Sequence, residues 1–356
     1  MKLRLEQVIC GMRDVASLII GNTAVVVTNG FVNCADALII LEEATSNKTS
    51  NLYDEYSQND LTNHLRRDGH DPVASGGFAD IYRGVLQTDW EPMRVAIKAI
   101  RTYSADDGSF FKKQKRLRRE ITVWLKLNHI NVLPLLGTTA GFGRFPAMVC
   151  PWIDNGSLTS YLEDSHDKLS VVQILTLLND AASGLQYLHS CSVVHGDLSG
   201  SNVLVCKDGR AYISDFGLST LLTELGGNTF ATSVHERGTL RWTAPELLDL
   251  EISEDEEAGS AKVMPTKHSD VYSFGGVMLQ ILAGKVPYHY YTREVQVVHA
   301  VSRGMTPRRP SSALVTERRW MILQWCWSTV DPSQSRPSSD DIVHFTNDEL
   351  AGVNTP

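Results

Sequence analysis

The sequence predicts an α+β fold with two lobes: a small one made mainly of strands around one helix, followed by a larger one made mainly of helices. Two observations lead to this prediction. Between about residues 70 and 150, short apolar runs such as 81–82 and 94–97 have the character of strands. From residue 151 onward, apolar residues recur mostly at helical spacing.

The helix of the small lobe is expected over about residues 107–127. Its apolar positions are Leu117, Ile121, Trp124 and Leu125. In the large lobe, helical spacing predicts helices over 171–188, 271–282 and 318–326. An acidic stretch over about 251–266 interrupts the large lobe and indicates a solvated surface insert.

Composition narrows the class of protein. The chain has 356 residues, 42% of them hydrophobic and 21% charged, which is typical of a soluble globular protein. A net charge of −8 argues against a surface built to bind nucleic acid. The 6 cysteines form no C-x-x-C pair, so neither a disulfide framework nor a zinc site is indicated. We therefore expect a reducing, cytoplasmic setting.

Residues 1–68 differ from the rest and are expected to form an N-terminal extension of unknown role. Residues 15–41 are rather apolar, but polar residues such as Asn22, Asn33 and Asp36 interrupt them, so no membrane span is predicted. No signal peptide is evident. One domain is expected over 69–350, divided into a small lobe (69–150) and a large lobe (151–350).

Two features of the small lobe suggest phosphate binding. The run Ala74-Ser75-Gly76-Gly77-Phe78-Ala79-Asp80-Ile81 places small residues where backbone could approach a triphosphate. Lys98 ends an apolar strand, where a buried cation needs an anionic partner. Taken alone, the first is equally an ordinary β-turn, and the second a lysine that extends to water.

Polar residues of the large lobe complete the set of groups that phosphoryl transfer requires. Asp197 and Asn202 lie five apart between apolar strands and supply a hydroxyl-orienting carboxylate and a neutral metal ligand. Asp215-Phe216-Gly217 adds a second carboxylate for Mg²⁺. Glu120, on the predicted helix, could reach Lys98. Each of these residues alone could have an ordinary structural role. Their occurrence together, in this order and at this spacing, is not explained in that way.

With Ala244-Pro245-Glu246 added, this ordered set resembles the protein-kinase superfamily over about residues 70–348. Cys326-Trp327 and the run 241–246 are similar to the tyrosine-kinase and tyrosine-kinase-like groups. The glycine-containing turn and His195-Gly196-Asp197-Leu198 are similar to expanded fungal tyrosine-kinase-like families. The resemblance implies a bilobal protein-kinase-like fold, ATP and Mg²⁺ as cofactors, and a protein substrate.

The resemblance also implies a role for each matching residue. Asp197, Lys98 and Glu120 are expected to be catalytic, with Glu120 the ion-pair partner of Lys98. Asn202 and Asp215 are expected to bind Mg²⁺. The residues expected to bind nucleotide are Ala74, Ser75, Gly76, Gly77, Phe78, Ile81, Ala96, Lys98, Cys150, Trp152, Asn202, Leu204 and Asp215. Two further residues are expected to be structural: Asp270 as the anchor of the catalytic loop, and Arg336 as the partner of Glu246.

The chain departs from the family pattern at several positions. Ala74 and Ala79 replace glycines of the phosphate-binding turn, and Gly196 replaces an arginine that usually pairs with an activation-loop phosphate. Ser199 and Ser201 stand where a lysine or an arginine usually neutralises the γ-phosphate. Thr239 is typical of serine/threonine kinases.

An active serine/threonine kinase of intracellular signalling is therefore predicted. Two alternatives stay open: a pseudokinase scaffold that binds nucleotide or partners, and a dual-specificity or tyrosine kinase. The sequence gives no prediction of oligomeric state.

Overall fold

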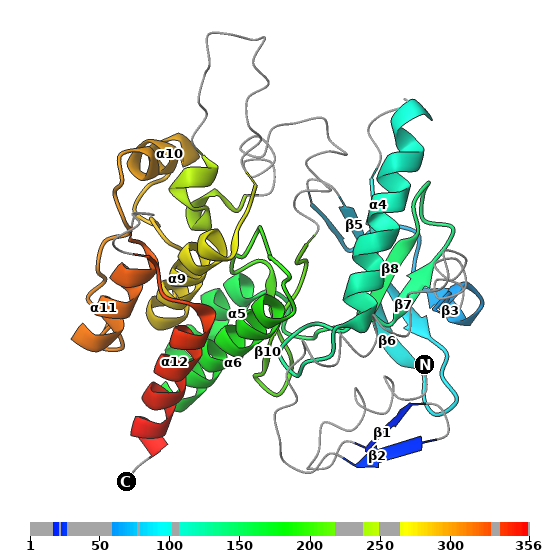
Figure 1. Cartoon of the computed structure of the whole chain (residues 1–356), viewed down its shortest axis with the longest axis horizontal. Helices are drawn as coiled ribbons and strands as arrows, with labels where there is room; N and C mark the ends of the chain where they lie inside the picture. Colours follow the sequence, from blue (N-terminus) through cyan, green and yellow to red (C-terminus); the bar gives the residue numbers. More distant parts are fainter. Residues whose placement is uncertain are drawn as a thin grey trace.

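The structure is a computed structural model. It describes residues 17–20, 23–26, 59–76, 79–101, 107–217, 238–248, 264–328 and 335–354. Residues 251–263 of the acidic insert predicted over about 251–266, and residues 77–78 of the predicted phosphate-binding turn, lie outside the described residues. Figure 1 shows the strands of the small lobe with one long helix on one side, and the helical large lobe on the other. The predicted α+β, bilobal arrangement is confirmed.

The small lobe is a six-stranded antiparallel sheet in the order β3-β5-β6-β8-β7, with β4 paired to β5. Its strands are β3 (Leu65–Arg67), β4 (Ala74–Ser75), β5 (Ala79–Leu86), β6 (Met93–Ile100), β7 (Gly137–Thr139) and β8 (Ala147–Pro151). The register pairs Ile81 with Lys98, and Ala96 with Cys150. Residues expected to bind nucleotide therefore lie side by side on three strands.

The sheet begins earlier than the sequence analysis expected. Residues 59–67 were assigned to the extension, yet β3 pairs with β5, and Leu61 is buried in the hydrophobic cluster of the sheet. A three-residue strand with two arginines carries little apolar pattern, so the sequence gives little indication of it. A separate antiparallel pair, β1 (Ser17–Ile20) and β2 (Thr23–Val26), lies further towards the N-terminus.

Helix α4 (Asp107–Lys126) joins the two lobes through its buried face. Leu117, Ile121 and Trp124 are buried, as predicted, whereas Leu125 is half-buried. The three buried side chains belong to the same hydrophobic cluster as the helices of the large lobe. The small lobe therefore rests on the large lobe partly through one amphipathic helix.

The large lobe consists mainly of helices, as predicted. They are α5 (Leu158–Ser165), α6 (Val171–Ser190), α9 (Lys267–Ala283), α10 (Glu294–Ser302), α11 (Glu317–Cys326) and α12 (Ser339–Asn354). The helices predicted over 171–188, 271–282 and 318–326 correspond to α6, α9 and α11. Capping boxes at Ser170 and Thr266 fix the starts of α6 and α9.

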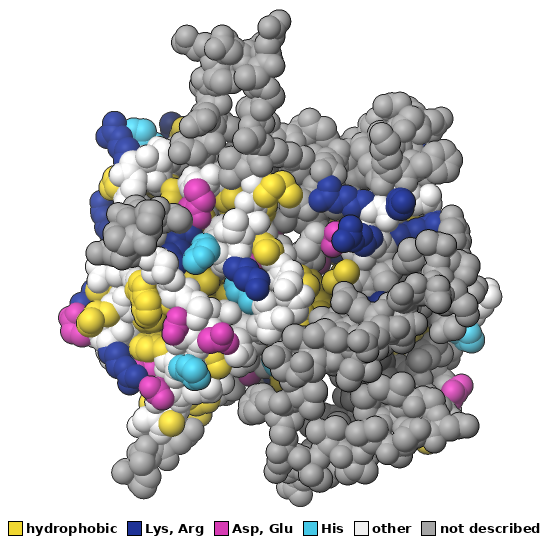
Figure 2. Space-filling view, in the orientation of Figure 1, with side chains coloured by type: hydrophobic (Ala, Val, Ile, Leu, Met, Phe, Trp, Pro, Cys, Tyr) yellow, Lys and Arg dark blue, Asp and Glu magenta, His cyan; other side chains and the backbone are white. Residues whose placement is uncertain are grey.

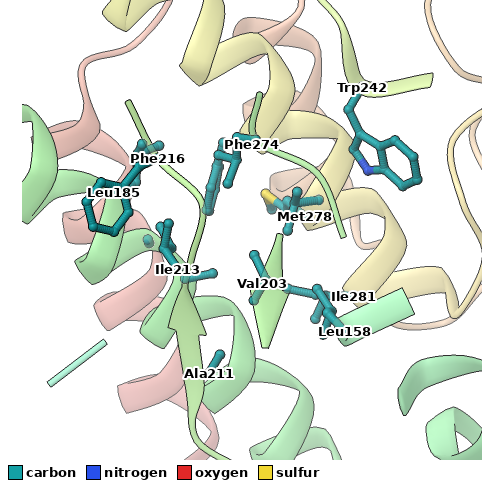
Figure 3. Packing of buried hydrophobic residues seen from close by; sticks show 14 of the residues in the cluster. Leu158, Leu185, Val203, Ala211, Ile213, Phe216, Trp242, Phe274, Met278 and Ile281 are labelled. Carbon is teal, nitrogen blue, oxygen red and sulfur yellow. The ribbon is translucent and has the colours of Figure 1, made fainter. Parts of the chain in front are cut away.

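Two short strands carry the candidate site on top of this helical core. They are β9 (Val203–Val205) and β10 (Ala211–Ile213), paired antiparallel. Figure 3 shows Val203 and Ile213 beside Phe274 and Met278 of α9. These four side chains are almost fully buried. The ends of both strands are thus held against a close-packed interior, which fixes the loops that follow and precede them.

None of the helices in the described ranges is long and apolar enough to span a membrane.

Candidate active site

The loop from His195 to Asn202, which carries the expected catalytic Asp197 and is called the catalytic loop below, is held by a buried carboxylate. Asp270 of α9 is 1% exposed. It accepts hydrogen bonds from the backbone N–H groups of His195 and Gly196, both at 2.8 Å, and lies 3.0 Å from Nε2 of His189. A buried carboxylate is stable only when it is well hydrogen-bonded, so these contacts fix the loop and the aspartate together. The predicted role of Asp270 as an anchor is confirmed.

Asp197 is oriented by neighbours from two different segments. Thr239 Oγ1 donates a hydrogen bond to Asp197 Oδ1 at 2.7 Å. Asn202 Nδ2 donates to the backbone carbonyl of Asp197 at 2.8 Å and lies 3.4 Å from Asp197 Oδ2. Because the amide nitrogen of Asn202 is engaged by Asp197, its amide oxygen is the atom suited to a metal ion.

An ion pair between Lys98 of the small lobe and Asp215 of the large lobe links the two lobes. Lys98 Nζ lies 2.5 Å from Asp215 Oδ1, and both side chains are partly buried. Asp215 has a φ of 61°, a left-handed conformation that non-glycine residues adopt rarely and at a cost of about 1–2 kcal/mol. The backbone N–H of Gly217 donates to the carbonyl of His195 at 3.1 Å and helps to hold this turn. Strained backbone of this kind is common at functional sites.

The expected ion pair between Lys98 and Glu120 is not formed among the described residues. Lys98 pairs with Asp215, and Oε2 of Glu120 lies 3.4 Å from the position that a Cβ on Gly217 would occupy. Burial raises the pKa of Glu120, and the nearby Arg116 and Arg119 oppose this shift. Glu120 therefore has other cations nearby, while Asp215 is the carboxylate closest to Lys98. The prediction placed Glu120 in the right neighbourhood but gave Lys98 the wrong partner for this structure.

Three rings from different segments pack edge to face near the site. Trp124 and Phe216 have ring centroids 5.1 Å apart, and His195 and Phe216 6.5 Å apart. Burial lowers the pKa of His195, and its Nδ1 accepts a hydrogen bond from the backbone N–H of Asp197 at 3.2 Å. A neutral histidine packed against Phe216 fits a structural role.

The described part of the glycine-containing turn is exposed to solvent. Ala74, Ser75 and Gly76 are exposed, and the backbone N–H of Gly76 donates to the carbonyl of Ala79 at 2.9 Å. Ala74 and Ala79 are strand residues, and neither has a positive φ. The two alanines that replace glycines therefore create no left-handed strain. Gly77 and Phe78 are outside the described residues.

The other expected nucleotide-binding residues lie where β6, β8 and β9 meet the connection between the lobes. Cys150 of β8 is buried, and burial raises the pKa of its thiol. The backbone N–H of Trp152 donates to the carbonyl of Arg94 at 3.0 Å. Leu204 of β9 pairs with Ser157. Ala96 and Ile81, on neighbouring strands, complete this wall.

Glu246 and Arg336 form the predicted pair. Two nitrogens of Arg336 contact the two carboxylate oxygens of Glu246 at 2.6 and 3.0 Å. Arg336 also donates to the carbonyl oxygens of His268 and Ser328. This buried arginine therefore ties the segment that contains Thr239 to the rest of the large lobe.

The catalytic loop itself contains no lysine or arginine from His195 to Asn202. Ser199, at the position of the usual lysine, is fully buried. Gly196 has a φ of 76°, a conformation that glycine adopts without steric cost. The cation that the described residues bring to this site is Lys98, from the small lobe.

One contact was not expected from the sequence. Thr239 was singled out only for its bearing on hydroxyl specificity, yet it binds the carboxylate of Asp197 across 42 residues of chain. No local pattern links the two residues. Because Asp197 and Thr239 are far apart in sequence, their contact can be recognised only in the folded structure.

Comparisons with known proteins agree with this geometry. A sequence model of the protein tyrosine and serine/threonine kinase family matches residues 69–345. The chain is 28% identical over 258 residues to the serine/threonine-protein kinase STY46 of Arabidopsis thaliana, covering 71% of this chain and 40% of that protein. It is 30% identical over 273 residues to the probable serine/threonine-protein kinase drkD of Dictyostelium discoideum, covering 76% and 19%.

A third relative, the dual specificity protein kinase pyk3 of Dictyostelium discoideum, is 28% identical over 274 residues, covering 76% of this chain and 18% of that protein. The chain thus spans less than half the length of each of these curated relatives.

Proposed function

Because the chain belongs to the protein tyrosine and serine/threonine kinase family, we propose that it transfers the γ-phosphoryl group of ATP to serine or threonine side chains of protein substrates in intracellular signalling. One observation carries the proposal: Asp197 is oriented by Thr239 and Asn202 in an anchored loop, close to the ion pair of Lys98 and Asp215. Phosphoryl transfer depends mainly on such positioning and on charge.

In this proposal, Asp197 orients the acceptor hydroxyl and takes up its proton. The hydrogen bond from Thr239 to Asp197 Oδ1 fixes the rotation of the carboxylate, so that the acceptor hydroxyl meets a defined oxygen. Lys98 would contact the phosphates of ATP and partly offset their charge. Its present partner, Asp215, would then be available to a metal ion.

The donor set fits Mg²⁺, which prefers carboxylate and amide oxygens. Asp215 offers a carboxylate, and Asn202 offers an amide oxygen, because its nitrogen is engaged by Asp197. Bound there, Mg²⁺ would neutralise charge on the transferred phosphoryl group. The residues proposed to surround the nucleotide are Ala74, Ser75, Gly76, Gly77, Phe78, Ile81, Ala96, Cys150, Trp152 and Leu204.

A cytoplasmic location is part of the proposal. Cys150, Cys191, Cys206 and Cys326, within the described residues, are free thiols. Free thiols are the usual state of cysteines in a reducing compartment.

The test is to incubate the purified protein with labelled ATP, Mg²⁺ and a generic protein substrate, alongside the Asp197→Asn variant. We expect label on serine and threonine in the wild type only. Label on tyrosine as well would change the assignment to a dual-specificity kinase. Equal label in wild type and variant, with both shown to be folded, would replace the proposal with a nucleotide-binding scaffold.

A further inference from the structure

A group of residues on the large lobe includes three exposed cations, Lys285, Arg303 and Arg308. We call it the basic surface; its residues are Lys285, His289, Tyr290, Arg303 and Arg308. Four of the five are exposed, and Tyr290 is half-buried. They lie between the end of α9 and the segment that follows α10. In Figure 2, dark blue side chains edge the large lobe around α10.

Contacts link Arg308, Tyr290 and His289 into one surface. The guanidinium carbon of Arg308 lies 4.5 Å from the ring centroid of Tyr290, and the Arg308 backbone N–H donates to the Tyr290 hydroxyl at 3.1 Å. The rings of His289 and Tyr290 have centroids 5.4 Å apart. Tyr288 Oη donates to the carbonyl of Met305 at 2.8 Å. The segments 285–291 and 303–308 are therefore packed together.

The basic surface is connected to the catalytic aspartate through a short segment. Thr239, which binds Asp197, is followed by η3 (Leu240–Trp242). Arg241 of η3 donates to the carbonyl oxygens of Pro287, Tyr288 and Tyr291 at 2.7–3.1 Å. This short connection suggests that a protein substrate whose hydroxyl meets Asp197 brings its flanking residues towards the basic surface.

The charges of this surface are not neutralised within the described part of the chain. Lys285, Arg303 and Arg308 form no ion pair there, whereas Arg309 pairs with Glu317 at 2.6 Å. Between residues 285 and 309, Glu294 is the single acidic residue. The pKa of His289 is lowered, first by burial and then by Lys285 and Arg241. Local positive charge persists here although the whole chain carries a net charge of −8.

We propose that the basic surface binds acidic side chains of the protein substrate, so that hydroxyls flanked by aspartate or glutamate are preferred. This inference rests on the proposed kinase function. Arg308 is held over the ring of Tyr290, so its guanidinium loses less freedom on binding a carboxylate. Unpaired cations beside a site also attract acidic partners during encounter and reject basic ones.

The test compares peptides that carry one serine and differ only in flanking charge. Acidic, neutral and basic residues are scanned over about five positions on each side, a reach of roughly 17 Å in extended chain. Phosphorylation gives kcat/KM, and fluorescence anisotropy of labelled peptides gives affinity without catalysis. The variant is Lys285→Glu with Arg308→Glu. The matched control, Lys168→Glu with Lys207→Glu, reverses two exposed lysines elsewhere on the large lobe.

We expect the wild type and the control to prefer the best acidic peptide over the neutral one by about tenfold, because each exposed ion pair contributes a severalfold effect. The variant should lose this preference and keep its kcat/KM on neutral peptide. Raising salt from about 0.05 to about 0.5 M should erode the preference of the wild type.

Equal use of acidic and neutral peptides by the wild type, or a preference that survives in the variant, would overturn the inference. An equal rise in the kcat/KM of the variant on all peptides would also overturn the inference. It would indicate that acidic residues of the chain itself, and not those of the substrate, bind the basic surface. If no peptide is phosphorylated but acidic peptides bind tightest in a manner that depends on Lys285 and Arg308, the kinase proposal fails and the basic surface stands.

Discussion

The proposed catalytic loop and the glycine-containing turn would serve the same proposed reaction but are held in different ways. Asp270, which is 1% exposed, accepts two backbone hydrogen bonds from the loop, and Thr239 binds the catalytic carboxylate itself. The turn at Ala74, Ser75 and Gly76 is exposed, and its hydrogen bonds among the described residues run to the adjoining strand β5. One region is fixed before substrate arrives, whereas the other can adjust.

This difference corresponds to what each region must do. A carboxylate that orients an attacking hydroxyl loses efficiency with small displacements, so it needs several constraints. A turn that covers phosphates must admit and release a nucleotide, so it needs small residues more than fixed contacts. Substitutions should therefore have large effects in the loop and small effects in the turn.

The largest effect is expected from Asp270→Asn. The change puts an amide next to two backbone N–H groups and leaves one of them unsatisfied, which should lower the free energy of unfolding by about 2–4 kcal/mol. Activity should fall about a hundredfold, because the loop loses its anchor. Urea denaturation and steady-state kinetics measure both. Asp340→Asn, which alters an exposed hydrogen bond to Gln186, is the control and should change neither by much.

Thr239→Val should have the next largest effect. It removes the hydroxyl that binds Asp197 Oδ1 while keeping the shape of the side chain. We expect kcat to fall about tenfold, the effect of losing one hydrogen bond to a charged group, with little change in KM. Thr239→Ser keeps the hydroxyl and should keep most of the activity. Equal losses in both variants would contradict a positioning role.

Lowering the pH should reduce the free energy of unfolding through His195. Burial lowers the pKa of His195 below its ordinary value of 6.5. The folded loop therefore resists protonation, while the unfolded chain takes up a proton below about pH 6.5. The contribution of His195 to stability is complete above that pH and is lost as the pH falls below it.

Unfolding measured from pH 7.5 to 5 should show this loss. Burial also lowers the pKa of His129, to about 4, so His129 adds to the slope. The His195→Asn variant isolates the part due to His195, because asparagine retains an acceptor but does not titrate. An identical slope in wild type and variant would contradict the assignment.

The smallest effect is expected from restoring the usual glycines of the turn. Ala74→Gly and Ala79→Gly change strand residues that have negative φ, so no strain is relieved. The free energy of unfolding should fall by about 0.5–1 kcal/mol for each substitution, and the KM for ATP should change less than about twofold. A large gain in activity would show that Ala74 and Ala79 restrict nucleotide binding at the turn. Substitutions in the turn would then have effects as large as those in the catalytic loop.

Much of this molecule follows from local pattern. Apolar spacing located α4, α6, α9 and α11, because a helix must bury one face whatever it packs against. Asp270 and Arg336 were assigned their roles from resemblance, and their buried charges found the expected partners. A buried charge has few acceptable environments, which makes its partner predictable.

Choices among several possible partners were settled only by the tertiary structure. Glu120 was the carboxylate expected to reach Lys98, but in the structure it lies near Arg116 and Arg119 of its own helix and near Gly217, and Asp215 is the neighbour of Lys98. The contact of Thr239 with Asp197 and that of Arg308 with the ring of Tyr290 join segments that are separate in sequence. Periodicity fixes which face of an element is buried, but it carries no information about which distant element meets that face.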